Sequence, residues 1–180
     1  MHFLFFQIYA RSALPQGCSA CYKVKVVLRT LRELVAAWGI AKRIECRSKW
    51  GVDLENPYSQ NIYAGYFYVA GHDMARVMYR VVREAFGNDP MLGPDIPMSI
   101  KRGCSVYEYT LGPSDRYEFK PELTELEEYL KSRFHANDIS GLRPVPLAYW
   151  IEIAFRIGDD TYLDFTHGKR LRPPTVSYEP

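Results

Sequence analysis

The stretch GCSACYKVKVVLRTLRELVAAWG, residues 17–39, contains the clearest patterns in the chain. Two cysteines, Cys18 and Cys21, stand three positions apart at its start. Over residues 22–38 the apolar residues then recur at three- and four-residue steps, which is typical of one face of an amphipathic helix, and Gly39 supplies a stop. The pattern predicts a helix that begins directly after a CxxC pair. Its buried face would contain Leu28, Leu31 and Val35.

The composition favours one domain with its own hydrophobic core. The chain has 180 residues, and 47% of them are apolar, which is enough apolar surface for a core without disulfides. Four cysteines are too few and too scattered for a disulfide scaffold, so we expect a reducing compartment, the cytoplasm. The opening HFLFFQIYA is too short to span a bilayer, and we expect it to be a first strand rather than a membrane segment.

The remaining patterns alternate between strand-like and helical periods. Gly39 is followed by IAKRIECRS, which favours a second strand, and the aromatic run IYAGYFYVAG predicts a strand or hairpin with a bulge at Gly65. Helices are predicted over 72–86 and 120–134. DIPMSI and CSVYEYTL are predicted to form one hairpin, and AYWIEIAFRI and TYLDFT to form a strand pair near the C-terminus.

This order predicts an α/β fold. We expect a single domain over residues 1–180, with a mixed central β-sheet flanked by helices in 1–134 and a C-terminal β extension in 135–180. The helix that follows the CxxC pair would pack its apolar face on that sheet.

Over about residues 3–134 the order of elements resembles the thioredoxin and glutaredoxin family. Members of that family place a CxxC after the first strand and a proline, usually cis, before the third; here GCSACYKVKVVL and DIPMSI occupy those places. The resemblance implies a thioredoxin-like fold with an inserted aromatic segment, and thiol–disulfide exchange with a protein disulfide or thiol substrate. It also implies that Pro97 lies beside Cys18 and Cys21 and offers the backbone of Ile96 to a bound peptide.

The position of the cysteines gives this chemistry a physical basis. A thiolate at a helix N-terminus is stabilised by unpaired backbone amides and by the helix dipole, which lowers the pKa of the thiol. Cys18 would therefore attack, and Cys21, one turn further on, would resolve the mixed disulfide. Lys23 and Lys25 would add positive potential that favours the thiolate.

A structural zinc site is the alternative use of the cysteines. The CxxC spacing allows two sulfurs to reach one tetrahedral ion, and Cys46 and Cys104 would complete a four-cysteine set with Cys18 and Cys21. The protein would then be a non-enzymatic binding or assembly module. Whether the chain is an enzyme stays open between these two readings.

A third hypothesis makes Cys18 the nucleophile of a hydrolase or acyl transferase. The segments GCSACYKVKVVLRTLRELVAAWGIAKRI and YWIEIAFRIGDDTYLDFTHG resemble the cysteine helix and the strand pair of transglutaminase-like thiol enzymes. Such chemistry needs a histidine base and a carboxylate that orients it. His167, close to Asp164, and His72 are the candidates for the base.

The charge distribution suggests a further partner. Residues 1–50 carry nine Lys or Arg and two Glu, whereas the whole chain has a net charge of only +2. A stripe of Lys25, Arg29 and Arg32 on the predicted helix, together with the tyrosine-rich segment 58–68, would suit a nucleic acid or an acidic protein partner. A solvated helix face and ordinary aromatic packing are the alternatives. The aromatic residues concerned are Tyr63, Tyr66, Phe67 and Tyr68.

Overall fold

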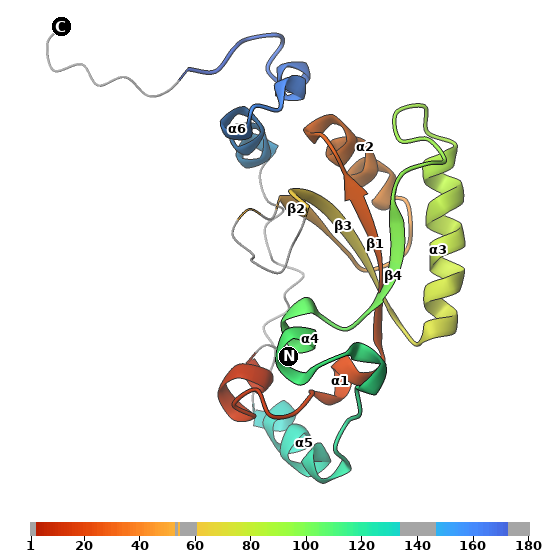
Figure 1. Ribbon diagram of the computed structural model, residues 1–180, viewed down its shortest axis with the longest axis vertical. Coiled ribbons are helices and arrows are strands. Elements are labelled where there is room, and N and C mark those ends of the chain that lie inside the picture. Colours follow the sequence, from red (N-terminus) through yellow and green to blue (C-terminus); the bar gives the residue numbers. More distant parts are fainter. Residues whose placement is uncertain (1–2, 53, 55–60, 134–146, 173–180) are drawn as a thin grey trace, which may run out of the picture.

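The computed structural model describes residues 3–52, 54, 61–133 and 147–172 (Figure 1). Within these residues a four-stranded sheet has helices packed on one face, a cluster of short helices at one end and α6 at the other. The predicted α/β class is confirmed, since strands and helices share one core.

The sheet contains β1 (Cys21–Leu28), β2 (Ser48–Val52), β3 (Tyr63–Ala70) and β4 (Met98–Arg102). Its strand order is β2-β3-β1-β4, and every neighbouring pair is antiparallel. The expectation of a mixed sheet is therefore wrong. Helix α2 (Leu31–Ala41) joins β1 to β2 and helix α3 (His72–Gly87) joins β3 to β4, which gives the β-α-β-β-α-β order of ferredoxin-like folds.

The predicted helix over 22–38 is wrong in its first part, because that part is β1. The residues Val24, Val26 and Leu28 are buried on one face of the sheet, whereas Lys25 and Val27 between them are only partly buried. Three- and four-residue spacing describes the same residues almost as well, but β-branched valines at every second position favour the strand. The helix begins only after Thr30, whose side chain accepts a hydrogen bond from the backbone N–H of Glu33.

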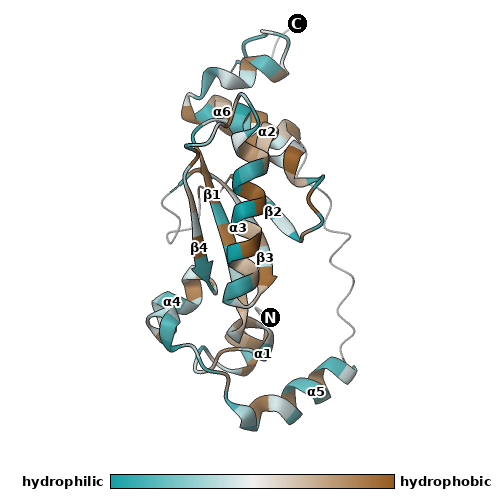
Figure 2. Cartoon of the chain, turned by 90° about the vertical axis from the view of Figure 1, so that its right-hand side faces the viewer, coloured by the Kyte–Doolittle hydropathy of each residue, from teal (hydrophilic) through white to brown (hydrophobic). Residues whose placement is uncertain are grey.

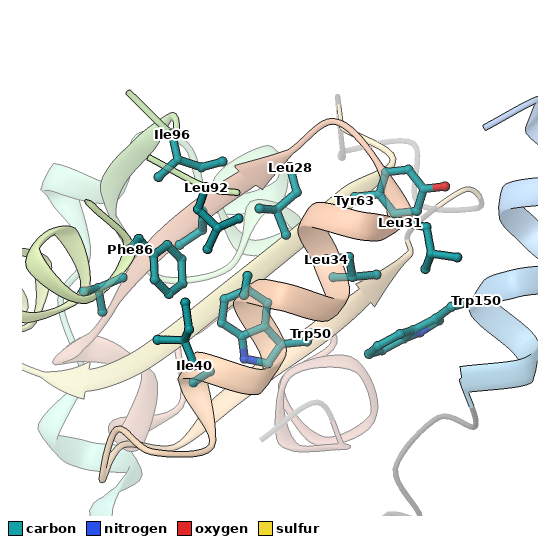
Figure 3. Close-up of a cluster of buried hydrophobic side chains, with 14 of the residues drawn as sticks. Leu28, Leu31, Leu34, Ile40, Trp50, Tyr63, Phe86, Leu92, Ile96 and Trp150 are labelled. Atoms are coloured by element: carbon teal, nitrogen blue, oxygen red, sulfur yellow. The ribbon is translucent and has the colours of Figure 1, made fainter. Parts of the chain in front are cut away.

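Helices α2 and α3 cover the same face of the sheet, and the main core lies between them and the strands (Figures 2 and 3). Gly65 has no bulge: it pairs regularly with Val26 and Trp50. A Cβ at this position would lie 2.0 Å from the Trp50 ring, so glycine leaves the space that the indole occupies. The core side chains labelled in Figure 3 are Leu28, Leu31, Leu34, Ile40, Trp50, Tyr63, Phe86, Leu92, Ile96 and Trp150.

Short helices form a second cluster at the end of the sheet where β1 begins (Figure 1). They are a π-helical turn at Leu4–Ile8, α1 (Gln16–Ser19), α4 (Ser105–Leu111) and α5 (Thr124–Arg133). We call this group the end cluster; the buried residues of its apolar core are Phe5, Leu14, Cys18, Tyr107 and Tyr117. The predicted strand at the N-terminus and the predicted strand within CSVYEYTL are wrong, since both segments are helical.

The buried carboxylate of Glu127 attaches α5 to the N-terminal segment. Glu127 is fully buried, and its Oε1 accepts hydrogen bonds from Tyr9 Oη at 2.9 Å and from the backbone N–H of Gln16 at 2.8 Å. The ammonium of Lys131 lies 3.7 Å from Oε2. A buried carboxylate needs such partners, so α5 is held by polar contacts more than by apolar ones.

The C-terminal segment of the chain, over residues 147–165, is helical. Helix α6 (Leu147–Ile157) and a 3-10 helix at Asp160–Phe165 replace the strand pair predicted there, and the β extension is wrong for 147–172; residues 135–146 and 173–180 lie outside the described residues. Trp150 packs edge to face on Trp38 of α2, with ring centroids 5.5 Å apart. Buried aromatic area explains why this segment prefers a helix against α2.

The other sequence predictions are confirmed in most cases. The aromatic strand, the helix over 72–86 and the acidic helix are confirmed as β3, α3 and α5, and DIPMSI contributes the start of β4. IAKRIECRS is wrong as a strand, because it holds the end of α2 and a turn. Among the described residues, none of the helices has the length and apolar character needed to cross a bilayer.

Candidate functional site: the face of the sheet opposite the helices

The face of the sheet turned away from α2 and α3 is basic and aromatic. Strand alternation and register place Lys23 and Lys25 of β1 opposite Tyr68 and Tyr66 of β3 on this face. Lys101 of β4 lies beside Lys23 on the other side. Lys49 of β2 is paired with Tyr66. We call this surface the open face; its polar and aromatic members are Lys23, Lys25, Lys49, Tyr66, Tyr68, Ser99 and Lys101.

The two tyrosines form an ordered pair on β3. Their ring centroids are 6.5 Å apart with an angle of 39° between the planes, and both side chains are partly exposed. The ammonium of Lys23 lies 5.2 Å from the Tyr66 ring centroid and 5.9 Å from that of Tyr68. Only 6% of the Lys23 surface is exposed, so a buried cation within 6 Å of both ring centroids helps to order the two rings. Burial first, and then the neighbouring Cys104 and Tyr66, raises the pKa of Tyr68 to about 12, so this phenol is neutral near pH 7.

Positive charge dominates the open face. Burial lowers the pKa of Lys25, and the neighbouring charges of Lys101 and Lys23 lower it further. Within the part of the chain that the structure describes, Lys23 and Lys25 form no ion pair, whereas Lys101 lies 2.8 Å from Glu108. Exposed Lys49 and Arg47 extend the charge towards β2. An anionic ligand would relieve this repulsion.

Cys18 does not lie at the start of the long helix that the sequence predicted. It belongs to α1, which has four residues, and packs in the end cluster with 7% of its surface exposed. Its thiol donates to Tyr107 Oη at 3.6 Å. Burial raises the pKa of the Cys18 thiol and outweighs the hydrogen bond to Tyr107, which lowers it. The expected lowering of the Cys18 pKa is therefore wrong.

Cys21 and Cys104 lie close enough to Cys18 to affect the pKa of its thiol, and Cys104 packs on the same cluster, whereas Cys46 lies apart. Cys21 is the first residue of β1, and burial raises the pKa of its thiol as well. Lys23 Nζ donates to Cys104 Sγ at 3.7 Å. Cys46 lies elsewhere, with its thiol 3.5 Å from the backbone oxygen of Tyr68. Among the described residues no group of three or more His, Cys, Asp or Glu has an arrangement that could hold a metal ion, so the four-cysteine zinc set of Cys18, Cys21, Cys46 and Cys104 is not assembled.

Pro97 is also far from the CxxC pair. Its carbonyl accepts from the backbone N–H of Val27 at 2.9 Å, near the end of β1, whereas Cys21 starts that strand. The described residues contain no cis peptide bond. A peptide bound beside Cys18 would therefore not reach the backbone of Ile96, and the arrangement implied by the thioredoxin resemblance is wrong on this point.

The histidines proposed as bases are not paired with Cys18. His72 begins α3, and its ring lies 5.5 Å from that of Tyr22. Asp164 forms an ion pair with Arg32 of α2, at the end of the molecule opposite α1, and His167 follows it there (Figure 1). The structure thus separates His167 and Asp164 from Cys18. His72 lies nearer, since the backbone N–H of the preceding Gly71 donates to the Ala20 oxygen at 2.8 Å, but its ring packs on Tyr22.

The predicted stripe of Lys25, Arg29 and Arg32 does not exist as one surface. Lys25 lies on β1, Arg29 contacts Glu33 at 2.8 Å, and Arg32 pairs with Asp164. The sequence reasoning found Lys25, Tyr66 and Tyr68 but missed Lys49 and Lys101 as their neighbours. The alternation in CYKVKVVL and YAGYFYVA was the signal that would have found the face, since Lys-x-Lys and Tyr-x-Tyr each mark one side of a strand.

No known protein family, curated protein or solved structure matched the chain in the comparisons.

Proposed function

We propose that the chain binds single-stranded nucleic acid on the open face of its sheet. The observation that carries the proposal is the pairing of Lys23 and Lys25 with Tyr68 and Tyr66 on one face, turned away from α2 and α3. Unpaired bases stack on aromatic rings, and phosphates are attracted to the lysines beside them. Four-stranded sheets with aromatic side chains on an exposed face are a recurrent platform for unpaired RNA bases.

The arrangement favours an unpaired strand over a duplex. Bases in a duplex are stacked on one another and present only their edges, so flat rings have no base face to bind. Tyr66 and Tyr68, two positions apart on one strand, would each take one base. Lys25, Lys49 and Arg47 are exposed or partly exposed and would follow the phosphates, whereas Lys23 is buried and orders the rings.

Fluorescence anisotropy tests the proposal. The labelled probes are oligo-U and oligo-dT of about 12 nucleotides and a duplex of equal length. We expect the single strands to bind more tightly than the duplex, and their affinity to fall steeply as salt is raised. Lys25→Ala and Lys49→Ala should each reduce the slope of log affinity against log salt by about 0.7, because each removes one phosphate contact.

The variant Tyr68→Ala separates the contribution of base stacking to the affinity from the contribution of charge. Losing one stacked base should weaken binding by about 1 to 3 kcal/mol while the salt slope stays unchanged. Lys120→Ala and Tyr129→Ala are the matched controls, since both residues lie outside the strands of the sheet and the Tyr129 side chain is exposed. Far-UV circular dichroism checks that each variant folds. Equal binding to the duplex, or affinity that ignores Tyr68 and Lys25, contradicts the proposal.

A further inference from the structure

Helix α3 exposes an apolar stripe on the side away from the sheet. Met74, Val77 and Val81 are 51%, 43% and 42% exposed, although the opposite side of the same helix buries Ala75 and Val82 completely. The three exposed residues are spaced by three and four positions, so they form one line along the helix. Contiguous exposed apolar groups on a folded chain are typical of surfaces that bind another chain, a membrane or a ligand.

Two opposite charges flank this stripe. Asp73 precedes Met74 and Arg80 precedes Val81, so both charged side chains lie on the same edge of the line. In the described part of the chain neither forms an ion pair, whereas the neighbouring Arg83 donates to the backbone oxygens of Pro94 and Ile96 at 2.6 and 2.7 Å. Asp73, Val77 and Arg80 also line a cleft that reaches Ile100 of β4.

We propose that α3 is the interface of a homodimer in which two copies pack this helix antiparallel about a two-fold axis at Val77. Such an axis brings Val77 against the second copy's Val77 and Met74 against the second copy's Val81. Spacing of three and four is the one that allows apolar side chains of two helices to interlock. A two-fold interface must be self-complementary, because the same patch supplies both sides.

The flanking charges meet that requirement. With the axis at Val77, Asp73 of each copy lies opposite Arg80 of the other, which gives two identical ion pairs. In a parallel two-fold pairing, the edge of one helix that carries these charges lies on the opposite side of the interface from the same edge of the other, so neither charge would face a partner. Charge complementarity therefore selects a second copy in antiparallel orientation.

The interface lies opposite the open face. Figure 2 looks directly onto α3, with the sheet behind it, so a second copy on this helix leaves the tyrosine and lysine surface uncovered. The dimer would present its two open faces outwards. This arrangement does not depend on whether the open face binds nucleic acid.

Sedimentation velocity of the full chain, without nucleic acid, tests the dimer. Three exposed apolar residues per copy make a small interface, so we expect the dimer fraction to rise with concentration between about 1 µM and about 1 mM. Val77→Glu should keep the chain monomeric over this range. Met91→Glu is the matched control: Met91 is 46% exposed but lies outside α3, and this variant should dimerise like the unchanged chain.

Charge exchange tests the orientation. Asp73→Arg and Arg80→Asp should each raise the dimer dissociation constant by about tenfold or more, because each places two like pairs across the axis. The double variant Asp73→Arg with Arg80→Asp restores opposite pairs and should return to within about threefold of the original constant. A monomer at every concentration, a dimer indifferent to Val77→Glu, or no rescue in the double variant overturns the proposal. Thermal unfolding of each variant separates loss of the dimer from loss of the fold.

Discussion

At the scale of single residues, the surroundings of Cys18 decide what its sulfur does. The CxxC spacing alone fits a redox pair, a metal site or a nucleophile. In the fold Cys18 is a small buried side chain in the end cluster, and Cys21 is the start of a strand. Thiol–disulfide exchange stays an untested prediction. It was based on a long helix that begins at Cys18, whereas Cys18 belongs to the four-residue α1 and β1 follows. Buried free cysteine commonly behaves as a small apolar group.

The raised pKa of Cys18 gives a testable consequence. We expect a variant that keeps Cys18 and replaces the other three cysteines with serine to be alkylated by iodoacetamide more slowly when folded than in denaturant. The midpoint of its rate against pH should also be higher in the folded protein, because burial disfavours the thiolate. Because the pKa of Cys18 is higher in the folded chain than in the unfolded chain, the protonated thiol stabilises the fold relative to the thiolate. This contribution to the free energy of unfolding is fully present below the unfolded pKa and is lost as pH rises through the folded pKa. A folded midpoint below that of the denatured chain would contradict this and support redox activation.

At the scale of elements, Asp159 joins three parts of the chain. Its Oδ2 accepts from the backbone N–H of Leu31 and from Tyr63 Oη, both at 2.7 Å, and its Oδ1 accepts from Thr161. It therefore supplements the N-cap of α2 and connects that helix to β3 and to the C-terminal 3-10 helix. Burial opposes ionisation, but the hydrogen bonds from Thr161, Leu31 and Tyr63 outweigh it and lower the pKa of Asp159.

Asp159→Asn is expected to destabilise the fold by about 1 to 3 kcal/mol near pH 7, because charge-assisted hydrogen bonds are replaced by weaker ones. A lowered pKa contributes stability above the unfolded value of about 3.9, and that contribution is lost as pH falls through the folded pKa. Urea unfolding at pH 7 and again below pH 4 measures both effects. The difference between the two proteins should shrink at the lower pH. A difference that is independent of pH would show that the Asp159 charge is not what stabilises this junction.

The sequence predicts an element well when its buried face follows one local period, and poorly when that face is buried by a distant segment of the chain. β3, α3 and α5 were predicted because each has one consistent period and clear stop signals. The segment around Val24 was assigned to a helix, since apolar residues at 24, 27, 28 and 31 satisfy the helical spacing while 24, 26 and 28 satisfy the strand spacing. The segment of α6 was assigned to a strand because its residues are β-prone. It forms a helix because it packs against α2, and this contact between distant segments is not contained in any local pattern.

The candidate site was predicted only in part for the same reason. Lys25, Tyr66 and Tyr68 could be named from their residue types, but the surface they share needs the register of β1 with β3. Lys49 and Lys101 join it through β2 and β4, whose pairing partners are not fixed by the local sequence.

At the scale of the whole molecule, two separate apolar clusters hold the chain together. The main core lies under α2 and α3, and the end cluster packs around Phe5 and Tyr107, whose ring centroids are 4.4 Å apart. The three tryptophans of the chain, Trp38, Trp50 and Trp150, all belong to the main core or pack against it. Tryptophan fluorescence therefore reports on one cluster and not on the other.

Phe5→Ala is expected to open the end cluster and spare the main core. Removing a fully buried phenyl ring typically costs about 3 to 5 kcal/mol, and this ring packs within the end cluster. Amide hydrogen exchange should therefore speed up in α4 and α5, while the tryptophan fluorescence transition in urea moves by less than about 1 kcal/mol. Leu34→Ala, a matched loss in the main core, should move the fluorescence transition by about 2 to 5 kcal/mol. If Phe5→Ala shifts both probes equally, the two clusters unfold as one cooperative unit, and the end of the sheet that carries Cys21 is stabilised by the whole fold rather than by its own packing.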